Sequence, residues 1–460
     1  MLRTGSQNRV LPVSAARAPY LWGFLVAVGV AAGCSAKVAG GAAGPFPSDA
    51  DAATASEIEE GAPDTDGVSV DAADGTAAVD TPQGEDTNTS PAGLSGADLH
   101  RATLASIAES VIQVSHEAFK ASAESLVTAT AAYADAQNET TLQAAREAWL
   151  SAMSLWQRAE VHQLGPGALS TKAVGGQGLR DEIYSWPVIN QCRVDQETVE
   201  DAWNSKESMA SEAINVRGLD AMERLLFNEG PDNACKPNSG INKNGTWDSF
   251  SEDERTARKA SYAHMLAQLL VDDAQVLIDA WTAGDAPFED SLATAGAGSP
   301  DFPTAQDALN ALSDALFYVE TEVKDMKMAE PLGSACDEEG CPESLESQYA
   351  QRSRENVIDN LYGFKAVFQG SADDPDALGF DDVLADVGAE ELATDMLEAV
   401  DAAIAALEGQ EATWASDLDA GGDAMANSYG YVAALTTLLK TSFVATLDLA
   451  LPKSAEGDND

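Results

Sequence analysis

Residues 142–156, LQAAREAWLSAMSLW, decide the fold class of this chain. Apolar and alanine side chains recur every three or four residues in this stretch, at Leu142, Ala145, Trp149, Ala152 and Trp156. Such spacing places them on one face of an α-helix, whereas a half-buried strand would alternate every two residues. The stretch therefore predicts a long amphipathic helix whose apolar stripe must be buried.

The same spacing recurs along the chain after about residue 97, in residues 104–118, 262–281, 305–328, 356–368, 389–407 and 425–447. Clusters of Gly, Pro and Asp separate these stretches. About eight long helices bury their stripes most economically in two antiparallel bundles of four. The sequence therefore predicts an all-α protein. We expect an N-terminal bundle at 98–245, a C-terminal bundle at 246–452 and an acidic tail at 453–460.

Composition narrows the classes of partner. The chain has 460 residues and a formal charge of -50, from 26 basic and 76 acidic side chains, and 45% of its residues are hydrophobic. That apolar share suffices for a folded core. A surface so acidic repels phosphate, so we expect no nucleic-acid partner. We instead expect this acidic surface to attract cations and cationic partners.

The N-terminus has the pattern of an export signal at residues 1–33. Arg3, Arg9 and Arg17 precede a short apolar run at 21–30, and small residues then lead to Cys34. The run is too short to span a bilayer comfortably. Small residues directly before a cysteine resemble a bacterial lipobox, which implies cleavage before Cys34 and a lipid on its sulfur. The alternative is an ordinary signal peptide in which this cysteine is incidental.

Residues 34–97 are rich in Ala, Gly, Pro, Ser, Thr and Asp and contain few large apolar side chains. Such a segment cannot bury enough surface to offset its ordering entropy. We therefore expect a disordered acidic linker that holds the folded part away from the membrane. The resemblance to lipoproteins implies that Ser35 after the cysteine is compatible with sorting to the outer membrane. The expected location is the bacterial cell envelope, lipid-anchored, at the outer membrane or the periplasmic face.

Four further cysteines in an exported chain predict disulfides. Cys336 and Cys341 are close enough to close a small loop, which leaves Cys192 to pair with Cys235. A zinc site built from the four is the alternative, although no CxxC pair occurs and the compartment favours oxidation.

Five stretches, taken in order, resemble one family. They are Ala148–Glu160 followed by Gly165–Pro166, Ile183–Pro187, Arg217–Phe227, Glu346–Gly363 and Leu449–Asp460. They are similar to the segments of the imelysin-like proteins, also classed as M75 peptidases, which include iron-regulated bacterial envelope proteins. The resemblance implies a two-bundle helical fold, exposure to the cell envelope and a link to iron uptake.

The resemblance also implies metal ligands at the third and sixth positions of a GxHxxE signature. Here those positions are Asp220 and Glu223, so the histidine is replaced. Residues three apart share a helix face, and Glu160 on a neighbouring helix is the candidate for a third carboxylate. An all-oxygen set suits ferric iron, calcium, magnesium or manganese. The alternative is a solvated helix face whose acids pair with Arg217 or Arg224.

Four more residues are candidates for the pocket. His162 does not share the helix face of Glu160, so we expect it at the helix C-terminus, with a role as replacement ligand as the alternative. Trp186 is either a core anchor or a wall of the site. Arg217 precedes the acidic pair, and Asn360 interrupts an apolar helix as a pocket residue or, in our interpretation, a buried structural one.

Two classes of function follow, with a third as an alternative. The first is a non-enzymatic lipoprotein that binds a divalent or ferric cation, or an iron-bearing ligand, together with envelope iron-uptake proteins. The second is a metal-dependent peptidase, as the family name implies. No HExxH or GxSxG motif occurs, and pairing of the cysteines removes thiol nucleophiles, so we assign no catalytic residue. The third is an interaction module whose metal site has decayed.

Overall fold

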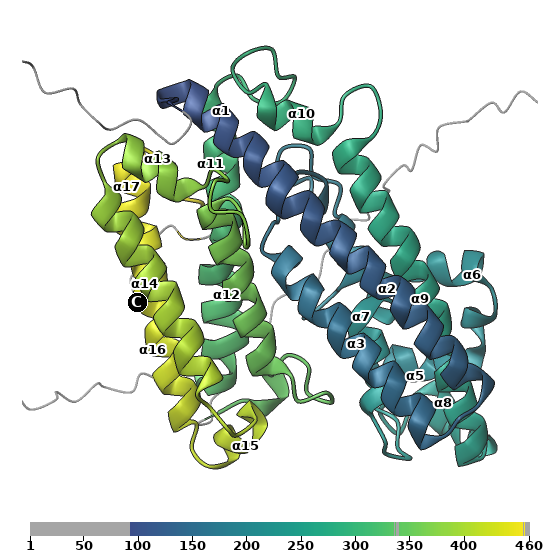
Figure 1. The fold of residues 1–460 in the computed structure, drawn as a ribbon. Helices are drawn as coiled ribbons and strands as arrows, with labels where there is room; N and C mark the ends of the chain where they lie inside the picture. Colours follow the sequence, from purple (N-terminus) through teal and green to yellow (C-terminus); the bar gives the residue numbers. More distant parts are fainter. Residues whose placement is uncertain (1–92, 335, 337–339, 454, 456–460) are drawn as a thin grey trace, which may run out of the picture. The chain divides into compact units, whose positions relative to one another are not determined.

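The computed structural model describes residues 93–334, 336, 340–453 and 455, and every regular element in these residues is helical (Figure 1). The predicted export signal, Cys34, most of the linker and most of the acidic tail lie outside the described residues. The all-α prediction is confirmed. No helix of the described part combines the length and apolar character needed to cross a membrane.

Ten α-helices of ten or more residues carry the architecture: α1 (Gly96–Ile107), α2 (Val114–Asp135), α3 (Glu139–Glu160), α5 (Gln191–Glu200), α7 (Gly218–Phe227), α9 (Glu252–Thr282), α11 (Ala305–Leu316), α12 (Ser353–Gln369), α14 (Glu390–Glu408) and α16 (Asp423–Leu438). Three π-helical segments continue or join them: η1 (Ala108–Gln113), η6 (Val319–Ser334) and η8 (Leu439–Phe443). The shorter α-helices are α4 (Leu179–Ile183), α6 (Lys206–Ala210), α8 (Gly240–Lys243), α10 (Phe288–Ala293), α13 (Phe380–Asp386), α15 (Trp414–Asp419) and α17 (Val444–Thr446). Single 3₁₀ turns are η2 (Gly165–Gly167), η3 (Ala202–Asn204), η4 (Ile214–Val216), η5 (Trp247–Ser249) and η7 (Pro342–Ser344).

Side-chain caps define where several long helices begin. Asn138 accepts a hydrogen bond from the backbone N–H of Thr141 at the start of α3. Ser251 and Glu254 form a reciprocal capping box at the start of α9. Each cap satisfies backbone donors that have no partner within the helix, and it contributes about 1 kcal/mol.

The first bundle consists of α2, α3, α7 and α9. Helix α2 packs against both α3 and α9, and α7 packs against α3 and α9. The apolar stripe of residues 142–156 lies inside this bundle, where Trp149 and Trp156 are almost fully buried. Trp149 also donates a hydrogen bond of 2.9 Å to the carbonyl of Leu219, which ties α3 to the start of α7.

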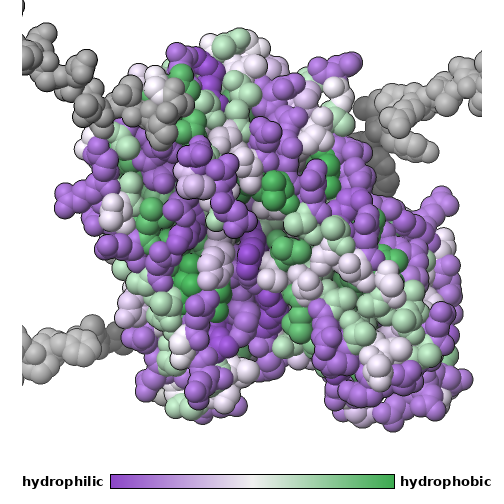
Figure 2. All heavy atoms as spheres, in the orientation of Figure 1, coloured by the Kyte–Doolittle hydropathy of each residue, from purple (hydrophilic) through white to green (hydrophobic). Residues whose placement is uncertain are grey.

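The second bundle consists of η6, α12, α14 and α16. Helix α16 packs against α14 and η6, and α12 packs against α14 and η6. The two bundles meet mainly where α12 lies along α3. Gly363 makes this approach close, because a Cβ atom there would lie 2.3 Å from the carbonyl oxygen of Arg158. One continuous apolar cluster runs through both bundles. Figure 2 shows hydrophilic side chains in the hollow between the two groups of helices.

The packing of α9 departs from the order of the sequence. Its residues follow position 245, where we predicted the second bundle to begin, yet α9 packs against α2, α4 and α7 of the first bundle. Helix contacts therefore group residues 252–282 with the N-terminal half. The other predicted stretches correspond to helices, although residues 305–328 are divided between α11 and η6.

Candidate functional site

The start of α7 places two carboxylates beside a neighbouring segment. Gly218 adopts a φ of +80°, and a Cβ atom there would lie 2.6 Å from the carbonyl oxygen of Ile183. Only glycine allows this approach without strain. As a result the first turn of α7 packs against residues 183–186, and the hydroxyl of Ser185 donates a hydrogen bond of 2.6 Å to Asp220.

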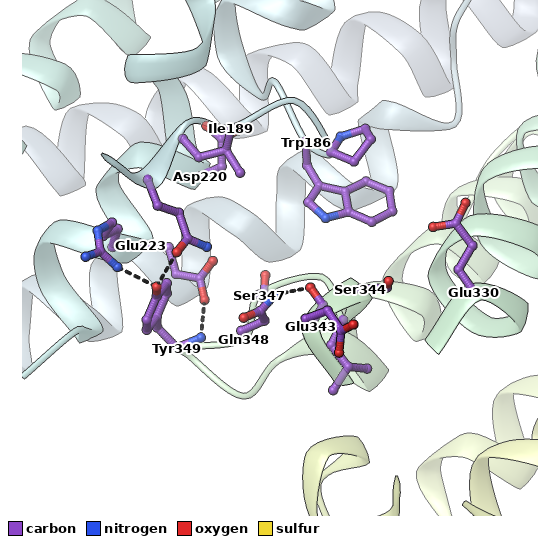
Figure 3. Close-up of a pocket in the computed structure, with 14 residues that line it drawn as sticks. Trp186, Ile189, Asp220, Glu223, Glu330, Glu343, Ser344, Ser347, Gln348 and Tyr349 are labelled. Atoms are coloured by element: carbon purple, nitrogen blue, oxygen red, sulfur yellow. Dashed lines mark hydrogen bonds between the residues drawn. The ribbon is translucent and has the colours of Figure 1, made fainter. Parts of the chain in front are cut away.

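Asp220 and Glu223 are both buried, with 5% and 6% of their surfaces exposed. The solvated-face alternative for this pair is therefore wrong. The backbone N–H of Ala221 also donates to Asp220, at 2.9 Å. Glu223 Oε1 accepts two hydrogen bonds from backbone N–H groups: one from Tyr349 at 2.8 Å, drawn in Figure 3, and one from Ala350 at 2.9 Å. The second carboxylate thus anchors a loop from the other half of the chain.

Burial dominates the electrostatics of this pair. Loss of water raises the pKa of Asp220 to about 7, against the hydrogen bonds from Ser185 and Ala221. It raises the pKa of Glu223 to about 8, and the nearby carboxylates of Glu346 and Asp220 add to the rise. Among the described residues, neither carboxylate forms an ion pair. Within this part of the chain, both groups are therefore held by hydrogen bonds and not by a cationic side chain.

Both carboxylates line a pocket with a volume of about 350 Å³. We call it the Asp220–Glu223 pocket, and its walls are Trp186, Pro187, Ile189, Gln191, Asp220, Glu223, Arg224, Glu330, Glu343, Ser344, Leu345, Ser347, Gln348 and Tyr349. Figure 3 shows Glu330 at the opposite end from Asp220 and Glu223. Residues from the segment before α7 and from the loop before α12 thus face one space, a size typical of small-ligand sites.

The arginines near the pair have other partners. Arg224 binds Asp195 through two hydrogen bonds, at 3.0 and 2.6 Å, and also donates to the hydroxyl of Tyr349. Arg217 forms an ion pair with Glu182. The alternative in which these arginines pair with Asp220 or Glu223 is therefore wrong, and Arg217, predicted as a pocket residue, does not line this pocket because it is held by Glu182.

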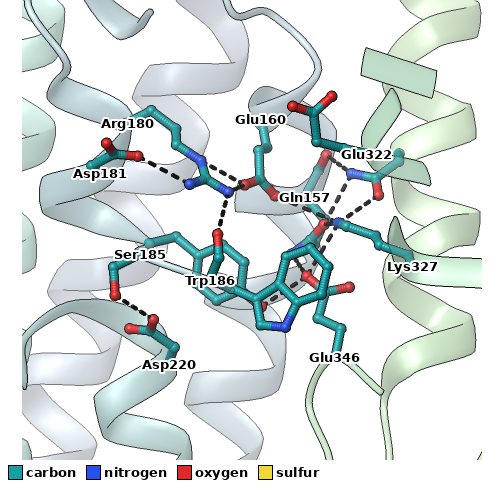
Figure 4. Close-up of polar contacts among 12 residues, drawn as sticks. Gln157, Glu160, Arg180, Asp181, Ser185, Trp186, Asp220, Glu322, Lys327 and Glu346 are labelled. Atoms are coloured by element: carbon teal, nitrogen blue, oxygen red, sulfur yellow. Dashed lines mark hydrogen bonds and ion pairs between the residues drawn. The ribbon is translucent and has the colours of Figure 1, made fainter. Parts of the chain in front are cut away.

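Glu160 does not join the other two carboxylates. Its Oε1 accepts hydrogen bonds from Nε of Arg180, at 2.8 Å, and from the Nη2 of the same guanidinium. Its Oε2 lies 3.7 Å from Nζ of Lys327. Figure 4 shows Glu160 between these two cations, while Asp220 is bonded separately to Ser185. The predicted cluster of three carboxylates is corrected to a pair, because two cations already neutralise Glu160.

Lys327 is the centre of a fully buried polar network. Its Nζ donates to Gln157 Oε1 at 2.6 Å and to Asn360 Oδ1 at 2.9 Å, and it lies 3.1 Å from Oε1 of Glu346. The same Glu346 oxygen accepts a hydrogen bond from the hydroxyl of Tyr184 at 2.7 Å. These contacts join α3, η6 and α12 where the bundles meet. Asn360 belongs to this network and does not line the pocket.

The remaining predicted residues have separate places. Trp186 lines the pocket, and Nζ of Lys327 lies 5.7 Å from the centre of its indole ring. His162 follows α3 and is buried away from the pocket, and desolvation lowers its pKa to about 4. Both predicted disulfides, Cys192–Cys235 and Cys336–Cys341, are present.

The donor set permits attachment of a cation but does not form a complete cage. Within the described residues, no group of three or more His, Cys, Asp or Glu side chains is arranged to hold a metal ion. Two carboxylates can still bind a hard cation whose other ligands are waters or atoms of a small molecule, as is common for Mg²⁺. The lining residues therefore fit a hydrated cation or a cation carried by a ligand.

A family model, a curated relative and two solved structures all match this chain to imelysin-like or iron-regulated proteins. The sequence model of imelysin, peptidase family M75, matches residues 112–441. "Iron-regulated protein A" of Synechococcus elongatus is 24% identical over 292 residues, which cover 63% of this chain and 70% of that protein. A crystal structure of a putative iron-regulated protein A precursor from Parabacteroides distasonis has a TM-score of 0.61 at 16% identity, covering 78% of this chain and 98% of that one. An imelysin-like protein from Psychrobacter arcticum has a TM-score of 0.56 at 17% identity, covering 77% and 97%.

Proposed function

Because this chain belongs to the imelysin family, we propose that it is a cell-envelope protein that binds a hard cation at the Asp220–Glu223 pocket. The cation is either free or part of an iron-bearing ligand, and the binding serves iron uptake without catalysis. The names of the relatives from Synechococcus and Parabacteroides, each called an iron-regulated protein A or its precursor, support the link to iron and to the envelope.

One observation carries the proposal. Two buried carboxylates face a single pocket, have raised pKa values and form no ion pair within the described residues. Bringing such groups together without a cation costs stability, and a bound cation removes that cost. Aspartate in place of the signature's histidine replaces a nitrogen ligand with a harder oxygen ligand. This favours ferric iron, calcium or magnesium over zinc.

The proposed location follows from the N-terminal sequence. Positively charged residues, a short apolar run and Cys34 have the order of a lipoprotein signal. A lipid on Cys34 would tether the helical part to the membrane surface through residues 35–97. Mass spectrometry of the protein extracted from its native membrane tests this, because acylation adds the mass of the lipid to the N-terminal peptide.

Metal analysis of protein purified without chelators is the first test. Ferric iron and calcium are then titrated into the wild type and into an Asp220→Asn/Glu223→Gln variant, which keeps the shape of both side chains. Glu117→Gln/Glu207→Gln, at exposed acids on α2 and α6, is the matched control for the loss of two negative charges. We expect binding in the wild type and the control and loss of binding in the double variant. Equal binding in all three proteins would exclude the site.

Incubation with an unfolded polypeptide, with and without a chelator, tests the absence of catalysis. We expect no cleavage above background. Metal-dependent cleavage that the Asp220→Asn/Glu223→Gln variant lacks would replace the non-enzymatic proposal with the peptidase alternative.

A further inference from the structure

A second pocket, of about 170 Å³, lies where the ends of α2 and α7 meet α3 and the start of α9. We call it the α9 pocket, and it shares no lining residue with the Asp220–Glu223 pocket. Arg146, Arg255 and Lys259 line it together with the exposed acids Glu229 and Glu252. Three cations in one small pocket are unusual for a chain with nearly three acids for every base.

Lys259 is the distinctive group in this pocket. Only 9% of its surface is exposed, and its Nζ donates a hydrogen bond of 3.2 Å to the carbonyl of Asn228. Of the buried lysines and arginines in the part of the chain that the structure describes, it is the one that forms no ion pair. Burying a charge without a counter-charge is costly, so this ammonium group lacks an anion.

Arg255 reinforces the positive charge one helical turn away. It lies four residues before Lys259 on α9, so the two side chains share a helix face, and like charges at this spacing repel. Its Nη1 donates to the carbonyls of Trp247 and Phe250, and it forms no ion pair with any described residue. Arg255 is the fourth residue of α9 and Lys259 the eighth, so both cations lie near the start of this helix.

We propose that the α9 pocket binds a small carboxylate-bearing molecule, with Lys259 and Arg255 as its cationic partners. The charges select a monoanion. Arg146 is already paired with Glu229 at 2.8 Å, and Glu252 is the other acid of the lining, so the five charged side chains of the lining leave one positive charge.

The apolar part of the lining selects an organic anion over an inorganic one. Leu142, Leu225 and Leu226 form part of the wall, so a short hydrocarbon body can pack there while the carboxylate faces the cations. The hydroxyl groups of Tyr133 and Thr256, which also belong to the lining, are further hydrogen-bond donors for carboxylate oxygens.

Titration of butyrate into the full chain tests the proposal, with chloride at equal ionic strength as the reference and phosphate as the inorganic alternative. Calorimetry should show saturable binding of butyrate. Lys259→Met keeps the apolar stem and removes the charge. We expect this variant to bind butyrate at least about tenfold more weakly than the wild type. Lys243→Met, at an exposed lysine of α8, should bind as the wild type does.

Arg255→Gln gives an independent variant should Lys259→Met not fold, and it should weaken butyrate binding in the same direction. Butyrate that binds the wild type no better than chloride would overturn the proposal. Unchanged affinity in the folded variants, or phosphate that binds more tightly than butyrate, would also overturn it. Metal titration of the same variants should match the wild type, because the two pockets share no residue.

Discussion

Replacing Glu223 with glutamine should stabilise the cation-free protein at neutral and alkaline pH. The substitution removes a buried negative charge but keeps an oxygen that can accept the hydrogen bonds from Tyr349 and Ala350. The loop before α12 therefore keeps its anchor. What changes is the free energy of holding a carboxylate in a pocket that lacks a cation.

The direction and size of this effect follow from proton linkage. Burial raises the pKa of Glu223 from 4.5 to about 8, so the folded state binds its proton more tightly than the unfolded state does. The stabilising contribution of the protonated group is complete below pH 4.5 and is lost as the pH rises through about 8. At 1.36 kcal/mol for each pKa unit, the free energy of unfolding should fall by about 5 kcal/mol across this range.

Urea unfolding of chelator-treated protein at pH 5, 7 and 9 measures the effect. The stability of Glu223→Gln relative to the wild type should increase from pH 5 to pH 9 by several kcal/mol, on the order of the linkage value. Glu343→Gln makes the same chemical change at an exposed position in the same pocket and should show no comparable trend. A difference between Glu223→Gln and the wild type that is equal at all three pH values would refute the reasoning.

Four other predictions follow from the same contacts. Cation binding at pH 6 should release close to two protons, from Asp220 and Glu223, as measured by calorimetry in buffers of different ionisation enthalpy. Asp220→His restores the signature imidazole and should raise the affinity for zinc relative to calcium in a competition titration. Lys327→Met leaves buried carboxylates without their cation and should lower the free energy of unfolding by about 3–5 kcal/mol in urea. Cys192→Ser/Cys235→Ser should cost about 4 kcal/mol by the same assay, since that disulfide closes a loop with a sequence separation of 43 residues.

Local patterns in the sequence predicted much of the fold because helix formation depends on near neighbours. The stripe in residues 142–156 corresponds to α3, and its tryptophans are buried as expected. The disulfides were also predictable, since few pairings of four cysteines were plausible. The partners of α9 were not, because stripe spacing shows that a face is buried without showing which helices bury it.

The sequence placed only two of the three candidate ligands together, because spacing along one helix defines a shared face whereas contacts between helices leave no such pattern. Spacing on one helix brought Asp220 and Glu223 together, and both line the pocket. Glu160 depends on Arg180, 20 residues later, and on Lys327, which belongs to another bundle. No sequence pattern linked these three side chains. The backbone N–H groups that bind Glu223 carry no side-chain signal at all, so their role became visible only in the structure.

The energy of the acidic pair bears on whether the site has decayed. A buried carboxylate without a partner destabilises the fold, whereas an apolar side chain of similar volume in the same place does not. In a decayed site only protonation of the two groups would offset that cost. Here both acids face the pocket, and Arg224, which lines the same pocket, is bound to Asp195 instead of neutralising them. Such an arrangement is stable only when the pocket takes up protons or a cation. Two measurements therefore test the free energy of keeping this pair ionised in the pocket. Proton release measures it when a cation binds, and the stability of Glu223→Gln measures it when the charge is removed.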